Sequence, residues 1–123
     1  GILGFSLYPH HLKNNTNCTL DSFCEMIART SDIMNIKNIG IGSDLCLNQP
    51  DEIVEWMRNG TWSKNKNYGE GSKNKPGFPK QPGWFEDARG FFNIEKGLRK
   101  VGFSEEETNG ILGNNWYNFY KTI

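Results

Sequence analysis

The cysteines and one aspartate are the first candidates for chemistry in this sequence. Cys18, Cys24 and Cys46 are odd in number and lack the spacing of a zinc knuckle, so they indicate neither a disulfide framework nor a metal site. Cys46 follows Asp44 by two residues and is either a soft metal ligand or a small hydrophobic side chain. Asp44 ends a short apolar segment and acts either in catalysis or as the cap of a turn or of a helix beginning near Pro50. On the residues alone, these alternatives stay open.

A second candidate is a loop insert, residues 61–83, that is rich in lysine, proline and aromatic residues. Trp62, Tyr68, Phe78 and Trp84 alternate with lysines, a composition that surfaces for single-stranded nucleic acid also have. The sequence, however, has 14 Lys+Arg against 14 Asp+Glu and contains no nucleic-acid-binding motif. We therefore expect a solvated lid or a contact with a neighbouring subunit, and no nucleic-acid partner.

Two strands joined by a helix are expected to position Asp44. Residues 2–8 form a short apolar run that Pro9 stops, and residues 37–44 have a core of alternating isoleucine and glycine, so both segments predict buried strands. Between them, Thr19 is a predicted N-cap, and a helix of about four turns follows from apolar residues at steps of three and four: Leu20, Phe23, Cys24, Ile27, Ala28, Ser31 and Met34. A strand, a helix and a strand in this order predict parallel pairing and an α/β fold.

The remainder of the chain is expected to be helical outside the insert. A short helix begins at Pro50 and ends near Gly60. Gly102 is a predicted C-cap, and residues 104–107 form a predicted capping box that opens the next helix. Gly113 is expected to stop that helix, and a last short helix carries an aromatic stripe of Trp116, Phe119 and Tyr120.

The length of 123 residues allows one domain, and no apolar run is long enough to span a membrane. Two parallel strands do not form a stable sheet alone, because parallel sheets are normally several strands wide and buried on both faces. The missing strands must therefore come from another chain or from the rest of a longer polypeptide.

Three stretches of the sequence, taken in order, resemble the C-terminal end of the membrane dipeptidase (renal dipeptidase-like) family of zinc peptidases, whose barrels belong to the amidohydrolase group. Residues 4–9 (GFSLYP) are similar to the penultimate barrel strand, and residues 36–44 (IKNIGIGSD) to the last strand with its closing aspartate. Residues 97–107 and 111–116 are similar to the closing helices. The resemblance covers nearly the whole chain except the insert.

The resemblance implies a (β/α)8 TIM barrel of which this chain, residues 1–123, is a single partial domain with about two parallel strands and four or five helices. It implies Asp44 as the catalytic proton shuttle and Tyr8 as a substrate-binding residue, which otherwise ends its strand and completes the core. His10 and His11 either reach the same mouth or form a solvated loop pair. One departure is that Leu45, Cys46 and Leu47 follow the aspartate where the family often has Phe-Asp-Gly.

The implied function is that of the C-terminal part of a zinc-dependent hydrolase that cleaves dipeptides with metal-activated water. Two zinc ions are expected in the full-length enzyme and none on this chain, because the family's ligands lie on earlier strands and have no matching positions here. The chain alone is then expected to be inactive, with the missing N-terminal barrel half as its partner. The alternative is a stand-alone, non-catalytic module that derives from the barrel and self-associates.

Overall fold

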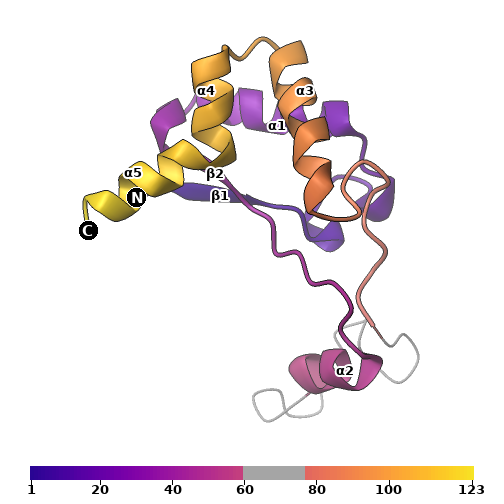
Figure 1. The fold of residues 1–123 in the computed structure, drawn as a ribbon. Coiled ribbons are helices and arrows are strands. Elements are labelled where there is room, and N and C mark those ends of the chain that lie inside the picture. The colour runs from indigo at the N-terminus through magenta and orange to yellow at the C-terminus, as the bar shows by residue number, and fades with distance from the viewer. Residues whose placement is uncertain (60–76) are drawn as a thin grey trace. The chain divides into compact units, whose positions relative to one another are not determined.

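The computed structural model describes residues 1–59 and 77–123 of the chain. Its elements follow in the order β1 (Leu3–Ser6), α1 (Leu20–Ser31), β2 (Ile39–Gly42), α2 (Asp51–Asn59), α3 (Phe91–Lys100), α4 (Glu105–Asn109) and α5 (Asn115–Lys121) (Figure 1). The chain divides into two compact units, one formed by Gly1–Leu45 with Gln81–Ile123 and the other by Cys46–Lys80. Within the described ranges, every helix is too short or too polar to cross a bilayer.

The strands β1 and β2 pair in parallel, and Ser6 at the end of one lies opposite Gly42 at the end of the other. Helix α1 connects the strands and covers one face of the pair (Figure 1). On that face the rings of Phe5 and Phe23 meet edge to face with centroids 6.4 Å apart. The predicted strand–helix–strand unit and the α/β class are therefore confirmed, and the arrangement is consistent with part of a TIM barrel.

Helix α1 forms where the apolar periodicity predicts it. The Thr19 side chain accepts the backbone N–H of Ser22 at 3.1 Å, which is the expected N-cap bond. The helix ends at Ser31, short of the predicted Met34. Near its end, the hydroxyls of Thr30 and Ser31 donate to backbone carbonyls of the preceding turn, and such local bonds compete with continuation of the helix.

Trp84 belongs to the core that lies against α1, and its expected place among the aromatic residues of the insert is wrong. Its ring packs on Phe23 with centroids 5.4 Å apart, and its indole N–H donates to the carbonyl of Cys18 at 2.7 Å. Asn93 of α3 in turn donates to the carbonyl of Trp84 at 2.8 Å. A half-buried indole with a satisfied N–H is a structural residue, so it is not available to a lid.

The other face of the strand pair is covered by Trp116 of α5. Gly4 and Gly40 stand opposite each other beneath the indole ring, and a Cβ on either would press into it. The indole N–H of Trp116 donates to the carbonyl of Ile41 at 2.9 Å, and its ring stacks on Tyr120. The glycines of the two strands thus leave the space that the indole fills.

The closing helices begin as the sequence predicts. Gly102 has φ of 112°, its N–H donates to Arg99, and the N–H of Phe103 donates to Leu98, which together form a Schellman motif at the end of α3. The predicted capping box is also present: Ser104 accepts the N–H of Glu107, whose carboxylate accepts the N–H of Ser104.

The expectation that Gly113 stops the helix is wrong. The chain continues from α4 through a π-helical turn, Gly110–Asn114, directly into α5. At its end, Asn115 donates to the carbonyls of Ile36 and Ile39 at 2.9 and 2.8 Å, beside the bond from Trp116 to β2. Two consecutive side chains that are anchored next to β2 hold the backbone helical where glycine alone would allow it to end.

The second unit contains α2, which begins at Asp51, one residue after Pro50. The carbonyl of Pro50 accepts the N–H groups of Ile53 and Val54 and so forms the first hydrogen bonds of the helix. The helix is described to Asn59, and its predicted end near Gly60 lies outside the described residues. Most of the predicted insert, residues 61–76, lies outside the described residues, and residues 77–83 form neither helix nor strand. The insert and the single partial domain stay predictions.

Candidate functional site

Tyr8 and Asp44 stand at the same edge of the strand pair. Ser6 and Gly42 are the last paired residues, and Tyr8 and Asp44 each follow two positions later. Parallel strands bring their carboxyl ends to one edge, which is where sites form in barrels and open α/β sheets. The parallel register therefore brings the two predicted site residues to one edge.

Asp44 is exposed in this chain and has a left-handed backbone with φ of 53°. Aspartate tolerates this conformation. The strand β2 ends at Gly42, two residues before the predicted end at Asp44. Its carboxylate forms no hydrogen bond or ion pair with the residues that the structure describes, so nothing there supports the cap alternative. Asp44 is, in this chain alone, a water-exposed carboxylate, and a catalytic role would require further protein surface around it.

Tyr8, in contrast, is buried, with 9% of its surface exposed. Its backbone N–H donates to the hydroxyl of Ser6 at 3.1 Å. The rings of His10 and His11 approach the Tyr8 ring edge-on, with centroid distances of 5.5 and 5.1 Å. Tyr8 thus completes the local core and at the same time supports two imidazoles at the site edge.

His10 and His11 lie on a 3-10 helix, Pro9–His11, directly after Tyr8, and both are exposed. Their rings are nevertheless fixed: Nδ1 of His11 lies 2.9 Å from the hydroxyl of Ser6, and Nδ1 of His10 lies 3.2 Å from the side-chain oxygen of Asn15. The histidines are therefore at the surface, as the loop alternative expects, but they are tethered. Ser6 was missed by the sequence reasoning, although a hydroxyl two residues before Tyr8 is a signal for a local side-chain-to-backbone turn.

No group of three or more histidine, cysteine, aspartate or glutamate side chains that could hold a metal ion is found in the described ranges. Cys46 is exposed, whereas Cys18 and Cys24 are buried. Burial raises the pKa of the Cys18 thiol, and for Cys24 burial, followed by the nearby Asp21 and Cys18, raises the pKa to about 12. The buried thiols are thus protonated packing residues.

This difference predicts that one of the three thiols reacts readily in the folded chain. A thiolate-specific reagent at neutral pH should modify Cys46 quickly, and Cys18 and Cys24 only after unfolding in urea, because reaction requires an accessible thiolate. Mass spectrometry of tryptic peptides measures each site. Fast modification of Cys24 without denaturant would contradict the described packing.

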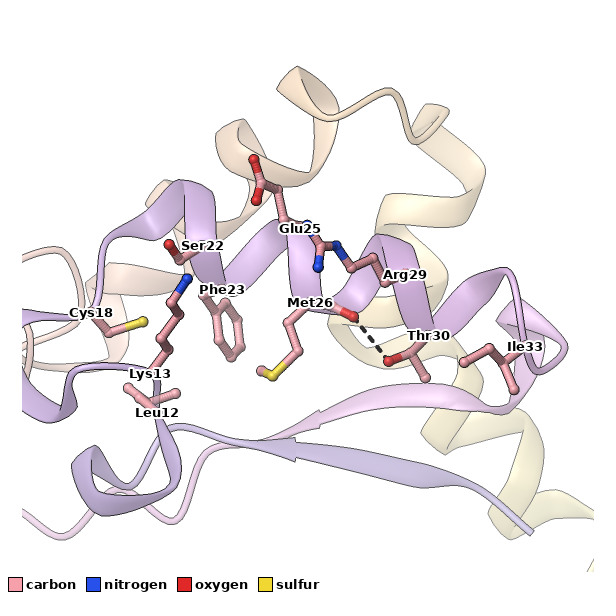
Figure 2. Close-up of a pocket in the computed structure, with 10 residues that line it drawn as sticks. All are labelled: Leu12, Lys13, Cys18, Ser22, Phe23, Glu25, Met26, Arg29, Thr30 and Ile33. Carbon is pink, nitrogen blue, oxygen red and sulfur yellow. Dashed lines mark hydrogen bonds between the residues drawn. The ribbon is translucent and has the colours of Figure 1, made fainter.

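A groove of about 290 Å³ runs along α1, and its lining includes Cys18 but neither Tyr8 nor Asp44. Figure 2 shows Phe23, Met26 and Ile33 along it, with the charged side chains of Lys13 and Arg29 also on its lining. Ile33 is 87% exposed and Met26 36% exposed. The groove is an apolar surface on the outer layer of the fold and contains none of the predicted site residues.

The described fold is similar to the crystal structure of an amidohydrolase from Pseudomonas aeruginosa, with a TM-score of 0.76 and 25% sequence identity. The match covers 94% of this chain and 34% of that protein, so the chain spans about a third of its length. No protein-family model and no curated protein matches the chain. The chain therefore has an amidohydrolase-like α/β fold, and the similarity supports a relationship to hydrolases.

Proposed function

We propose that this chain is the C-terminal part of a zinc-dependent, dipeptidase-like hydrolase. The observation that supports this best is the parallel register, which brings Tyr8 and Asp44 to the same end of the strand pair. The fold that holds them is similar to that of an amidohydrolase. Because the chain spans a third of that neighbour, the proposed enzyme includes further chain that this structure does not contain. The membrane dipeptidase-like family is the finer assignment that the three sequence stretches suggest.

In the proposed reaction, Asp44 accepts a proton from the attacking water and passes it to the leaving amine. The water oxygen bonds to the peptide carbonyl carbon, the C–N bond breaks, and one dipeptide with one water gives two amino acids. The Asp44 carboxylate is exposed at the end of the strands, so it is accessible as the acceptor. Tyr8 would contribute its ring to the wall of the substrate site.

The described residues do not fit a zinc site, since they contain no cluster of metal-binding side chains. The proposal therefore places both zinc ions on ligands outside the described chain and assigns this chain no ligand. When bound, zinc lowers the pKa of water toward neutrality and so supplies the nucleophile. This chain would contribute the proton-transfer group, and by itself it would be inactive.

The proposal can be tested in a chimera that carries this chain in place of the matched third of the Pseudomonas amidohydrolase. With zinc supplied, the proposal expects hydrolysis of dipeptides by the chimera and none by this chain alone. The parent amidohydrolase serves as the control for folding and metal loading. A well-folded, zinc-loaded chimera that cleaves no dipeptide would contradict the proposed substrate class.

Self-association is a second candidate function, and a specific observation favours it. Within the described ranges β1 pairs only with β2, so each strand has an edge without a neighbour. Leu3 on β1 is 45% exposed, and Ile33 and Met26 expose further apolar surface along α1. Open strand edges and adjoining apolar surface are typical of interfaces.

Replacing Ile33 with glutamate should lower any self-association of the isolated chain by about tenfold or more, because a carboxylate would have to be desolvated in the interface. Light scattering over a range of concentrations measures the oligomeric state. Lys37→Glu, which changes an exposed residue outside the groove, is the control. A strictly monomeric parent chain would exclude the self-associating module.

A further inference from the structure

The contact between Ser6 and His11 joins a strand end to an exposed imidazole. Ser6 is the last residue of β1, and its hydroxyl lies 2.9 Å from Nδ1 of His11. The same hydroxyl accepts the backbone N–H of Tyr8 at 3.1 Å. The Tyr8 ring, which is buried, lies edge-on to His11. The exposed His11 side chain is thus held by Ser6 and by the Tyr8 ring. Holding it costs side-chain entropy that a freely rotating surface histidine would keep.

The Ser6 hydroxyl can hold the imidazole in both of its protonation states. When His11 is neutral, the hydroxyl can donate its proton to Nδ1 while it accepts the N–H of Tyr8. When His11 is an imidazolium, the hydroxyl can accept from Nδ1 with its second lone pair, since a serine oxygen has two. The ring therefore does not need to move when it gains charge, and Nε2 keeps its direction.

The imidazolium would form no ion pair within 4 Å among the residues that the structure describes. The nearest titratable neighbours that the contacts show are Tyr8 and, across its ring, His10, which is a second imidazole of the same sign. An oriented imidazolium that forms no ion pair of its own, at the carboxyl ends of the strands, is suited to an external anion.

We propose that His11, positioned by Ser6, is a binding group for a carboxylate-bearing ligand at this edge of the strand pair. The imidazolium would donate from Nε2 to a carboxylate oxygen, while Nδ1 stays bonded to Ser6. The inference concerns binding and requires no hydrolysis, so it stands or fails separately from the proposed reaction. It assigns Ser6 the role of a positioning residue and gives His10, which is held separately by Asn15, no part in binding the ligand.

The test uses the two histidines of the chain as internal probes. The ring nitrogens of the ¹⁵N-labelled full chain are observed by NMR at about pH 5.5, where an ordinary imidazole is mostly protonated. Acetate and glycylglycine are the carboxylate probes, and acetamide is the neutral control of similar shape. We expect saturable shifts of the His11 ring with both carboxylates, little change at His10, and no saturation with acetamide.

Variants separate binding from general effects. His11→Gln should abolish the saturable response, whereas His10→Gln should leave it intact and assign the signals. Ser6→Ala should weaken acetate binding about three- to tenfold, the scale of one hydrogen bond, and Ser6→Thr should restore it because it keeps the hydroxyl. Equal shifts at both histidines that do not saturate would overturn the proposal, and so would the same response to acetamide. Both outcomes are measured on the parent chain, so they do not depend on the stability of Ser6→Ala.

Discussion

Replacing Asp44 with asparagine should lower the turnover of a dipeptide by about a hundredfold or more in the chimera with the Pseudomonas amidohydrolase. Asparagine has the size and shape of aspartate but cannot accept the proton of the attacking water. Steady-state kinetics with zinc supplied measures the loss. Zinc content, determined in parallel, should be unchanged, because the proposal assigns Asp44 no metal.

The matched control is Asp32→Asn, which makes the same chemical change at an exposed aspartate on the C-cap of α1. We expect it to alter turnover by less than about twofold, since it lies at the end of α1 that precedes β2 and not at the carboxyl ends of the strands. Full activity of the Asp44→Asn chimera would remove this residue from the mechanism. The amidohydrolase-like fold would be unaffected by that result.

The fold around Asp44 could be predicted because its signals are local. The alternating isoleucine and glycine before Asp44, the cap at Thr19 and the three- and four-residue spacing up to Ile27 each follow from backbone geometry within one element. The parallel order follows from the connection between the strands. Together these local signals place Asp44 and Tyr8 at the same end of the strand pair.

The environment of these residues could not be predicted, because it depends on contacts between distant elements. Trp84 directly follows the insert and continues its pattern of aromatic residues, yet its indole N–H donates to the carbonyl of Cys18, 66 residues away. Gly113 predicts the end of a helix. However, the Asn115 side chain donates to the carbonyls of Ile39 and Ile36, 76 and 79 residues away, and these bonds keep the backbone helical. The exposure of Asp44 likewise depends on which distant segments pack against it, and the residues next to it in the sequence do not show this.

Gly40→Ala should destabilise the chain by about 2–4 kcal/mol, the sum of a forced repacking and a weakened hydrogen bond. The new methyl group would overlap the Trp116 indole, which bonds to Ile41 and stacks on Tyr120. The indole would have to move, and both contacts would weaken. Urea unfolding followed by circular dichroism measures the change.

Gly83→Ala is the control, because a Cβ there meets no atom within 4 Å, and it should change stability by less than about 0.5 kcal/mol. A double-mutant cycle with Trp116→Ala identifies the cause. If the indole is the obstacle, Gly40→Ala should cost much less once the ring is absent, and the two substitutions should be strongly non-additive. If Gly40→Ala lowered the free energy of unfolding equally with and without the indole, glycine would be required by the strand itself. The Trp116 ring would then not be the reason for glycine at this position.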